Sequence, residues 1–126
     1  MRRTVLVVED DPCVRLLLEV GLRDLGADLV GVPDGPSALQ AAARRAPDVV
    51  LLDVGLPGPD GLAVCGALRA MPATSRVPIA LVSGFPASFF EARGRAAGAD
   101  AYFAKPFRVA DVRRFVEEHL RAACGC

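Results

Sequence analysis

Apolar residues gather in five short runs, which alternate along the chain with five longer stretches of helical period. The runs cover 4–8, 28–32, 48–52, 78–82 and 99–104. Two of them, 5–8 and 49–52, are apolar at every position, as is typical of strands that helices cover on both faces. The alternation predicts a doubly wound α/β fold with five parallel strands in the order 2-1-3-4-5 and five flanking helices. The less apolar second run is expected at an edge of the sheet.

Polar residues and prolines mark where the helices begin. Asp11 followed by Pro12 is typical of a helix start, because aspartate caps the first free N–H groups and proline is tolerated at the first helical position. This predicts a first helix over about 12–25, and further helices over about 36–45, 60–70, 87–97 and 107–122. The fourth helix is the weakest because Gly94 lies in its interior. The stripe expected to be buried in the first helix consists of Val14, Leu17, Leu18, Leu22 and Leu25.

Length and composition favour one domain over residues 1–126. Apolar residues make up 52% of the chain and the formal net charge is zero, which argues against disorder and against a nonspecific nucleic-acid or membrane surface. Apolar runs are too short for a bilayer span or a signal peptide, so the chain is expected to be soluble and cytoplasmic. Cys13 and Cys65 are predicted to be core residues, and residues 123–126, with Cys124 and Cys126, a frayed tail.

Candidate chemistry lies directly after the apolar runs. Glu9, Asp10 and Asp11 follow the first run, Asp53 the third, Ser83 the fourth and Lys105, the only lysine, the fifth. In the predicted strand order these four strands are neighbours, and ligands gather beyond the carboxyl ends of such strands. We therefore expect the acids, the hydroxyl and the ammonium to share one rim.

Carboxylates that share a rim repel one another unless a cation lies between them. Mg²⁺ suits an oxygen-only set of this kind, although Asp11 is better explained as a helix cap. Beside such an ion, Asp53 can serve as a ligand or as a nucleophile that forms an aspartyl phosphate. Ser83 and Lys105 would then each hold one oxygen of a transferred phosphoryl group.

Four motifs resemble the receiver domain of two-component response regulators, over essentially the whole chain. The match lies at 5–12 (VLVVEDDP), 47–53 (PDVVLLD), 56–62 (LPGPDGL) and 98–107 (GADAYFAKPF). The resemblance implies a flavodoxin-like fold and a signalling protein of a phosphorelay rather than a conventional enzyme.

The same resemblance implies a role for each site residue. Asp53 would accept a phosphoryl group from the phosphohistidine of a sensor kinase or a histidine phosphotransfer protein, with self-catalysed phosphorylation and dephosphorylation. Mg²⁺ would be bound by Asp10, Asp53 and the Gly55 carbonyl, with Glu9 acting through water. Ser83 and Lys105 would contact the phosphoryl group, and the peptide bond before Pro106 is often cis in this family.

The resemblance also implies an output face made of the fourth helix, the last strand and the last helix. Ser83 and Tyr102 match the family's switch pair, although Tyr102 fits a half-buried strand residue equally well. The face would bind an unknown protein target or a second copy of the chain, with no direct contact to nucleic acid or membrane. Because Phe89 and Phe90 are adjacent, either one of them faces outward, or the fourth helix is short and both rings fold under it.

Three positions depart from the family's usual residues. Ser83 replaces the commoner threonine, Gly84 the usual alanine, and Gly55 a larger side chain, which leaves an opening for water beside Asp53.

Two other functions compete with a phosphorylated receiver. A phosphorylation-independent docking module is one alternative. An aspartate-nucleophile phosphohydrolase is the other, but it needs an acid two positions after its nucleophile, where this chain has Gly55.

Overall fold

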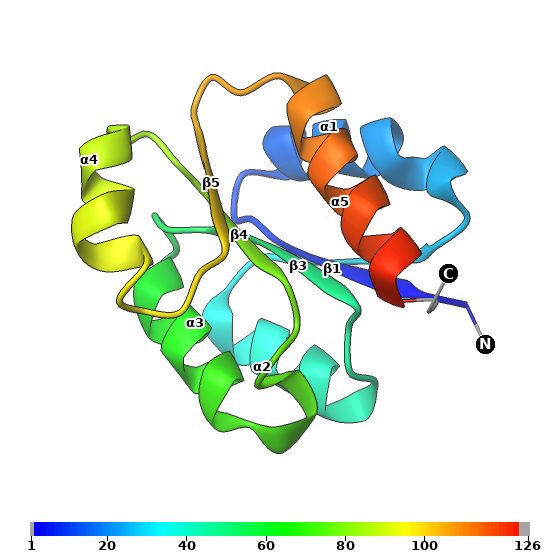
Figure 1. The fold of residues 1–126 in the computed structure, drawn as a ribbon, viewed down its shortest axis with the longest axis horizontal. Helices are drawn as coiled ribbons and strands as arrows, with labels where there is room; N and C mark the ends of the chain where they lie inside the picture. Colours follow the sequence, from blue (N-terminus) through cyan, green and yellow to red (C-terminus); the bar gives the residue numbers. More distant parts are fainter. Residues whose placement is uncertain (1, 124–126) are drawn as a thin grey trace.

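The computed structural model, described here over residues 2–123, is a sheet with helices on both faces (Figure 1). The five parallel strands lie in the order β2-β1-β3-β4-β5, which confirms the predicted topology. Their bounds are β1 Thr4–Val8, β2 Asp28–Val32, β3 Val49–Asp53, β4 Ile79–Ser83 and β5 Ala101–Ala104. Every residue of β1, β3 and β4 is buried, whereas the edge strands β2 and β5 are only partly covered.

Alternate residues of the central strands enter two separate cores, one on each face of the sheet. Leu6 and Val8 pack with α2 (Gly35–Arg44) and α3 (Gly61–Ala70), while Val5 and Val7 pack with α1 (Pro12–Leu22) and α5 (Val109–Ala123). This two-sided burial explains why these strands are apolar at every position. Short 3-10 turns follow α1 at Arg23–Leu25 and α3 at Pro72–Thr74.

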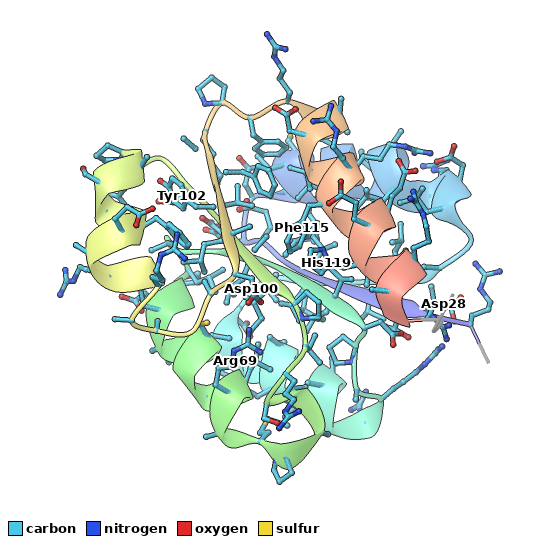
Figure 2. The ribbon with its side chains drawn as sticks, viewed as in Figure 1. Asp28, Arg69, Asp100, Tyr102, Phe115 and His119 are labelled. Carbon is cyan, nitrogen blue, oxygen red and sulfur yellow. The ribbon has the colours of Figure 1, made fainter. Side chains whose placement is uncertain are left out.

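Three helices begin directly after an aspartate that caps them. The side chains of Asp11, Asp34 and Asp60 accept hydrogen bonds from the N–H groups of Cys13, Ser37 and Ala63 and cap α1, α2 and α3. At the end of α3, Arg69 and Asp100 point toward one another (Figure 2) and form a 2.9 Å ion pair that ties this helix to the start of β5.

The predicted fourth helix is shorter than expected and changes type. α4 covers only Ala87–Phe89 and continues as a π-helical segment over Phe90–Gly94. A Cβ on Gly94 would lie 2.6 Å from Cδ1 of Phe90 and 3.0 Å from Cδ1 of Leu81, so glycine is required for this segment to approach β4. Phe90 is buried and Phe89 is half-buried, so the helix is short and neither ring lies fully in solvent.

Two expectations for α1 are wrong. Leu17 is 50% exposed, because the helix turns Leu18 and Leu22 toward the sheet and α5. Cys13, in the first turn, is also exposed, whereas Cys65 in α3 is buried as predicted. Of the predicted tail, Ala123 belongs to α5, and Cys124 and Cys126 lie outside the described residues. No helix within residues 2–123 is both long and apolar enough to cross a membrane.

Candidate functional site

The carboxyl ends of four neighbouring strands bring the predicted site residues together. The register pairs Val8 of β1 with Leu52 of β3, and Ser83 of β4 with Ala104 of β5. Glu9, Asp53 and Lys105 therefore lie at or directly beyond adjacent strand ends. The Lys105 N–H donates a 2.7 Å hydrogen bond to the Ser83 carbonyl, which continues the pairing of β4 and β5 to the site itself.

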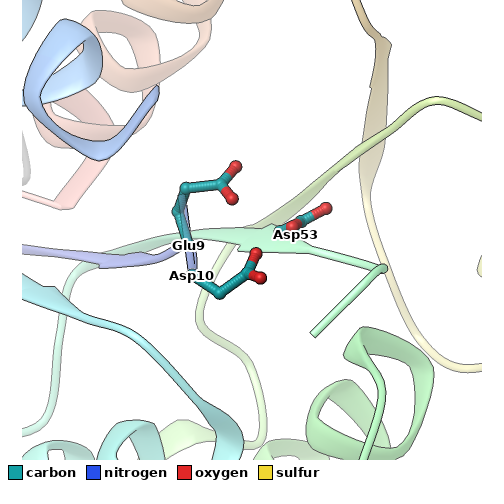
Figure 3. A group of neighbouring side chains, drawn as sticks. All are labelled: Glu9, Asp10 and Asp53. Atoms are coloured by element: carbon teal, nitrogen blue, oxygen red, sulfur yellow. The ribbon is translucent and has the colours of Figure 1, made fainter. Parts of the chain in front are cut away.

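Three carboxylates form the centre of the site. Glu9, Asp10 and Asp53 point toward one another (Figure 3), and one oxygen atom of each lies within 4.8 Å of the other two. Glu9 is 1% exposed and Asp53 5%, whereas Asp10 lies at the surface. The cluster is therefore buried on one side and open to solvent on the other.

Lys105 is the cation that faces this cluster. Its Nζ lies 3.0 Å from Oε1 of Glu9 and 3.5 Å from Oδ1 of Asp53. Burial lowers the pKa of Lys105, but the hydrogen bond with Glu9 and the charge of Asp53 raise it by more, so that its net pKa lies above the ordinary value. The ammonium is therefore charged, and one positive charge faces three carboxylates.

Backbone and side-chain donors fix Glu9 in this position. The Asp11 N–H donates to Oε2 of Glu9 at 3.1 Å, and Nη1 of Arg15 donates to the Glu9 carbonyl at 2.6 Å. Burial raises the pKa of Glu9 to about 7, and the negative charge of Asp53 adds to this, while the Asp11 N–H and Lys105 oppose it. The site thus holds more negative charge than its own donors can stabilise.

The donor set fits a divalent cation. Oε1 of Glu9 is buried and, apart from the ion pair with Lys105, has no well-directed hydrogen-bond donor among the described residues. When all three carboxylates are ionised and Lys105 is charged, two negative charges remain unbalanced, and one divalent ion would neutralise them. Oxygen ligands from one or two carboxylates are typical of Mg²⁺ in proteins. Asp10 and Asp53 carry oxygen atoms of this kind. Their role as ligands stays a prediction, as does that of the Gly55 carbonyl.

Glycines allow the loop after β3 to lie against Asp53. The Gly55 N–H donates to Oδ1 of Asp53 at 3.2 Å. A Cβ on Gly61 would lie 2.3 Å from the Asp53 carbonyl oxygen, so only glycine lets α3 begin directly beneath the end of β3. This role of Gly61 was not predicted from the sequence, although the motif Asp60-Gly61 was the available signal. Arg15, which fixes the Glu9 carbonyl, gave no such signal.

Ser83 and Tyr102 meet through the short loop after β4. Oγ of Ser83 accepts a 3.0 Å hydrogen bond from the Phe85 N–H, and the Tyr102 hydroxyl donates to the Phe85 carbonyl. The half-buried Tyr102 ring stacks on Phe90 with 5.6 Å between ring centroids. The two predicted switch residues are therefore linked through Phe85, and the Tyr102 hydroxyl also lies 3.4 Å from the Ser83 carbonyl oxygen. This linking role of Phe85 was not predicted from the sequence. The cis peptide bond expected before Pro106 is present.

Comparison with known proteins decides the family. The family model described as "Response regulator receiver domain" matches residues 5–117. This chain belongs to the response regulator receiver domains. The receiver domain of the sensor histidine kinase PA1611 from Pseudomonas aeruginosa, described with a magnesium ion in its active site cleft, has a TM-score of 0.84 and 32% identity. That likeness covers 94% of this chain and 97% of the PA1611 chain.

Other relatives are response regulators rather than conventional enzymes. A putative response regulator from Chloroflexus aurantiacus J-10-fl has a TM-score of 0.86 and 34% identity, over 96% of this chain and 99% of its own. The DNA-binding response regulator MtrA of Mycolicibacterium smegmatis is 40% identical over 121 residues, which are 96% of this chain and 52% of MtrA. The chain thus spans about half the length of the curated relatives it matches.

Replacing Glu9 by glutamine should remove a pH dependence of stability in the Mg²⁺-free receiver. Because the pKa of Glu9 rises from 4.5 to about 7 on folding, the folded chain binds more protons than the unfolded chain between these values. The free energy of unfolding should therefore fall as pH rises from 4.5 through 7. Urea unfolding at pH 5.5 and 8 measures this. Equal pH dependence in Glu9→Gln and the parent would show that Glu9 is not the group responsible.

Proposed function

We propose that this receiver domain takes a phosphoryl group from a partner phosphohistidine onto Asp53 and signals through the change that follows. The observation that carries the proposal is the position of Asp53, a nearly buried carboxylate with Lys105 at 3.5 Å and two further acids around it. A structural role alone would not require three carboxylates at the end of apolar strands. The family's phosphorelay function supports the assignment.

The arrangement of donors assigns a task to each oxygen of Asp53. The Gly55 N–H and the Lys105 ammonium both lie against Oδ1, so we assign the attack on phosphorus to Oδ2. A P–O bond forms at Asp53 as the P–N bond of the phosphohistidine breaks, and the imidazole leaves and takes up a proton. Lys105 then pairs with a phosphoryl oxygen, and the Ser83 hydroxyl binds another.

Asp10 and Asp53 would hold Mg²⁺ directly, with Glu9 acting through water and the Gly55 carbonyl as a further ligand. When bound, this ion supplies positive charge to the oxygens of the phosphoryl group. Glu9 keeps Lys105 within reach of Asp53 through their 3.0 Å ion pair. Asp11 contributes only its N–H, which holds Glu9, because its side chain caps α1.

Intact mass measurement after incubation with Mg²⁺ and acetyl phosphate tests the central residue. The parent should gain one phosphoryl group per chain and Asp53→Asn none, because an amide is not a nucleophile at this site. Asp60→Asn, which changes a helix cap on the neighbouring loop, is the matched control and should be phosphorylated. Equal phosphorylation of Asp53→Asn and the parent would contradict the proposal.

An apolar surface beside the site fits the partner that carries the phosphohistidine. Three large apolar side chains of α1 are about half exposed to solvent: Leu16 (57%), Leu17 (50%) and Val20 (48%). So much exposed apolar surface on one helix is unusual and is typical of an interaction site. A hollow of about 410 Å³ joins this surface to the site and is lined by Val14, Leu17, Lys105, Pro106 and Phe107. We infer that an apolar helix face of the partner covers α1 and brings its histidine to Asp53.

Leu17→Asp should separate docking from chemistry. Burying a leucine contributes about 1.5–3 kcal/mol, so loss of this contact should slow transfer from the phosphorylated partner at limiting concentration by roughly tenfold or more. Phosphorylation by acetyl phosphate should not change, because Asp53 and Lys105 are intact. Transfer assays with the two donors measure the difference. Equal slowing with both donors would place the effect in the site rather than in docking.

The open space beside Asp53 favours rapid loss of the phosphoryl group. A Cβ on Gly55 would meet only Oδ1 of Asp53, at 3.9 Å, and a Cβ on Gly84 would meet nothing within 4 Å. Phe85 is 50% exposed and stacks on Phe89, so its ring lies at the opening without sealing it. Water can therefore reach phosphorus, and its attack would release inorganic phosphate and restore the Asp53 carboxylate.

Gly55→Arg should prolong the life of the phosphorylated receiver, because its side chain has room to occupy the path of the water. The decay of phosphorylated protein, followed by phosphate release after removal of the donor, measures the effect. Gly66→Ala adds a Cβ that meets nothing within 4 Å on α3 and serves as a control that should decay like the parent. A Gly55→Arg protein that loses phosphate as fast as the parent would refute this explanation.

The loop between Ser83 and Tyr102 offers a route for the signal. If the Ser83 hydroxyl turns to the phosphoryl group, the Phe85 N–H loses its acceptor, and Phe85 also accepts the Tyr102 hydroxyl. Phosphorylation should therefore move Tyr102 relative to Phe90 and alter the face formed by α4, β5 and α5. The absence of direct nucleic-acid contact stays a prediction, as does a homodimer through this face.

NMR signals of Tyr102 and Phe85 test this route directly. In the parent, phosphorylation should shift the NMR signals of the Tyr102 ring and of the Phe85 amide. Ser83→Ala removes the hydroxyl that couples them to the site, so these shifts should shrink on phosphorylation. Unchanged Tyr102 signals in the phosphorylated parent would exclude the route through Phe85.

A further inference from the structure

The carbonyl group between the first two acids after β1 accepts a hydrogen bond from a side chain of α1. Nη1 of Arg15, near the start of this helix, donates to the Glu9 carbonyl oxygen at 2.6 Å. That carbonyl belongs to the peptide unit that joins Glu9 to Asp10. Because a peptide unit is planar, a contact that fixes its oxygen restrains the Cα atoms of both acids.

Asp10 depends on this peptide unit more than its neighbour does. The Glu9 side chain has contacts of its own, with the Asp11 N–H and with the ammonium of Lys105. The Asp10 side chain is exposed and, in the described part of the chain, forms no hydrogen bond or ion pair. Only the position of its backbone therefore keeps its carboxylate close to that of Asp53 (Figure 3).

The edge strand β2 supports the same peptide unit and the arginine that holds it. The Glu9 N–H donates to the Val32 carbonyl at 3.0 Å. Arg15 lies against this strand as well, because a Cβ on Gly31 would be 3.0 Å from its Cδ and 3.3 Å from its Cγ. Since residue 31 has no side chain, the arginine stem can lie over the strand while its guanidinium reaches the Glu9 carbonyl.

Arg15 orients the acids without neutralising them. Among the described residues its guanidinium forms no ion pair, and its hydrogen bond goes to a carbonyl rather than to a carboxylate. The negative charge of the cluster therefore stays available to a cation. On charge alone, a guanidinium this close would disfavour a bound cation. The charge of Arg15 and its orienting contact thus have opposite effects, which an experiment can separate.

We propose that Arg15 is a positioning residue for the magnesium site. It holds the peptide unit between Glu9 and Asp10, and thereby keeps the Asp10 carboxylate beside that of Asp53. The inference rests on the proposed binding of Mg²⁺ and extends it to a residue outside the ligand set. Groups that orient the ligands of a metal site change the metal affinity by about 10–100-fold when they are removed.

Arg15→Met tests the inference in a Mg²⁺ titration of the unphosphorylated full chain, followed by the NMR signal of the Asp10 amide. Methionine keeps an apolar stem over Gly31 but removes the donor, so Mg²⁺ should bind about tenfold more weakly. Loss of the positive charge alone would strengthen binding instead. Arg76→Met, before β4 at the opposite end of the strands, removes the same charge and should bind like the parent.

Gly31→Val is a second variant, which leaves Arg15 itself unchanged. Its side chain would occupy the place of the arginine stem, so Mg²⁺ should again bind more weakly than in the parent. Added to Arg15→Met, the same change should have no further effect, because the donor that it displaces is already absent.

The Mg²⁺ dependence of phosphorylation by acetyl phosphate separates positioning from a general loss of structure. Arg15→Met should need about tenfold more Mg²⁺ than the parent to reach its half-maximal rate. Its rate at saturating Mg²⁺ should stay close to that of the parent, because Asp53, Ser83 and Lys105 are unchanged.

Three results would overturn the inference. They are a Mg²⁺ affinity of Arg15→Met equal to or higher than that of the parent, an additive loss when Gly31→Val is combined with it, or a lower saturating rate with an unchanged Mg²⁺ requirement. A parent chain that binds no Mg²⁺ would contradict the proposed metal site itself, and the role of Arg15 would fail with it.

Discussion

The structure depends on one interaction, the contact of a single ammonium with carboxylates from two neighbouring strand ends. Lys105 reaches Glu9 at 3.0 Å and Asp53 at 3.5 Å, and thereby links the ends of β1, β3 and β5 electrostatically. The ammonium balances only one of the three carboxylates of the cluster. Burial, with the charge of Asp53 added to it, raises the pKa of Glu9 to about 7. The remaining negative charge explains why the donor set suits a divalent cation. Phosphoryl chemistry at Asp53 is the use that such a site supports best.

Much of this arrangement could be predicted from the sequence, because it follows from strand order. Continuous apolar runs are typical of strands buried on both faces, and the strand order of a doubly wound sheet places the ends of β1, β3, β4 and β5 side by side. Glu9, Asp53, Ser83 and Lys105 directly follow or end those runs, so their meeting needs no tertiary detail. The family motifs then gave each residue a role that periodicity alone could not provide.

Other features depend on which of several apolar residues a helix turns inward. Leu16, Leu17 and Leu18 are consecutive, and the sequence does not say that Leu18 faces the sheet while Leu16 and Leu17 face solvent. The wrong predictions for Leu17 and Cys13 have this origin, since both residues lie on the uncovered side of α1. The π-helical segment at Phe90 could not be predicted from the sequence either, because it depends on the close contact of Gly94 with Leu81.

The most direct test of this charge cluster is the Mg²⁺ dependence of phosphorylation by acetyl phosphate, measured for the parent and for Lys105→Arg. The parent should be phosphorylated once per chain in Mg²⁺ and not in EDTA. Lys105→Arg should lose most of its reactivity in Mg²⁺ even though the charge is kept, because a planar guanidinium cannot replace a compact ammonium between Glu9 and Asp53. Equal phosphorylation of the parent in EDTA and in Mg²⁺, or full activity of Lys105→Arg, would contradict the central role of this charge cluster.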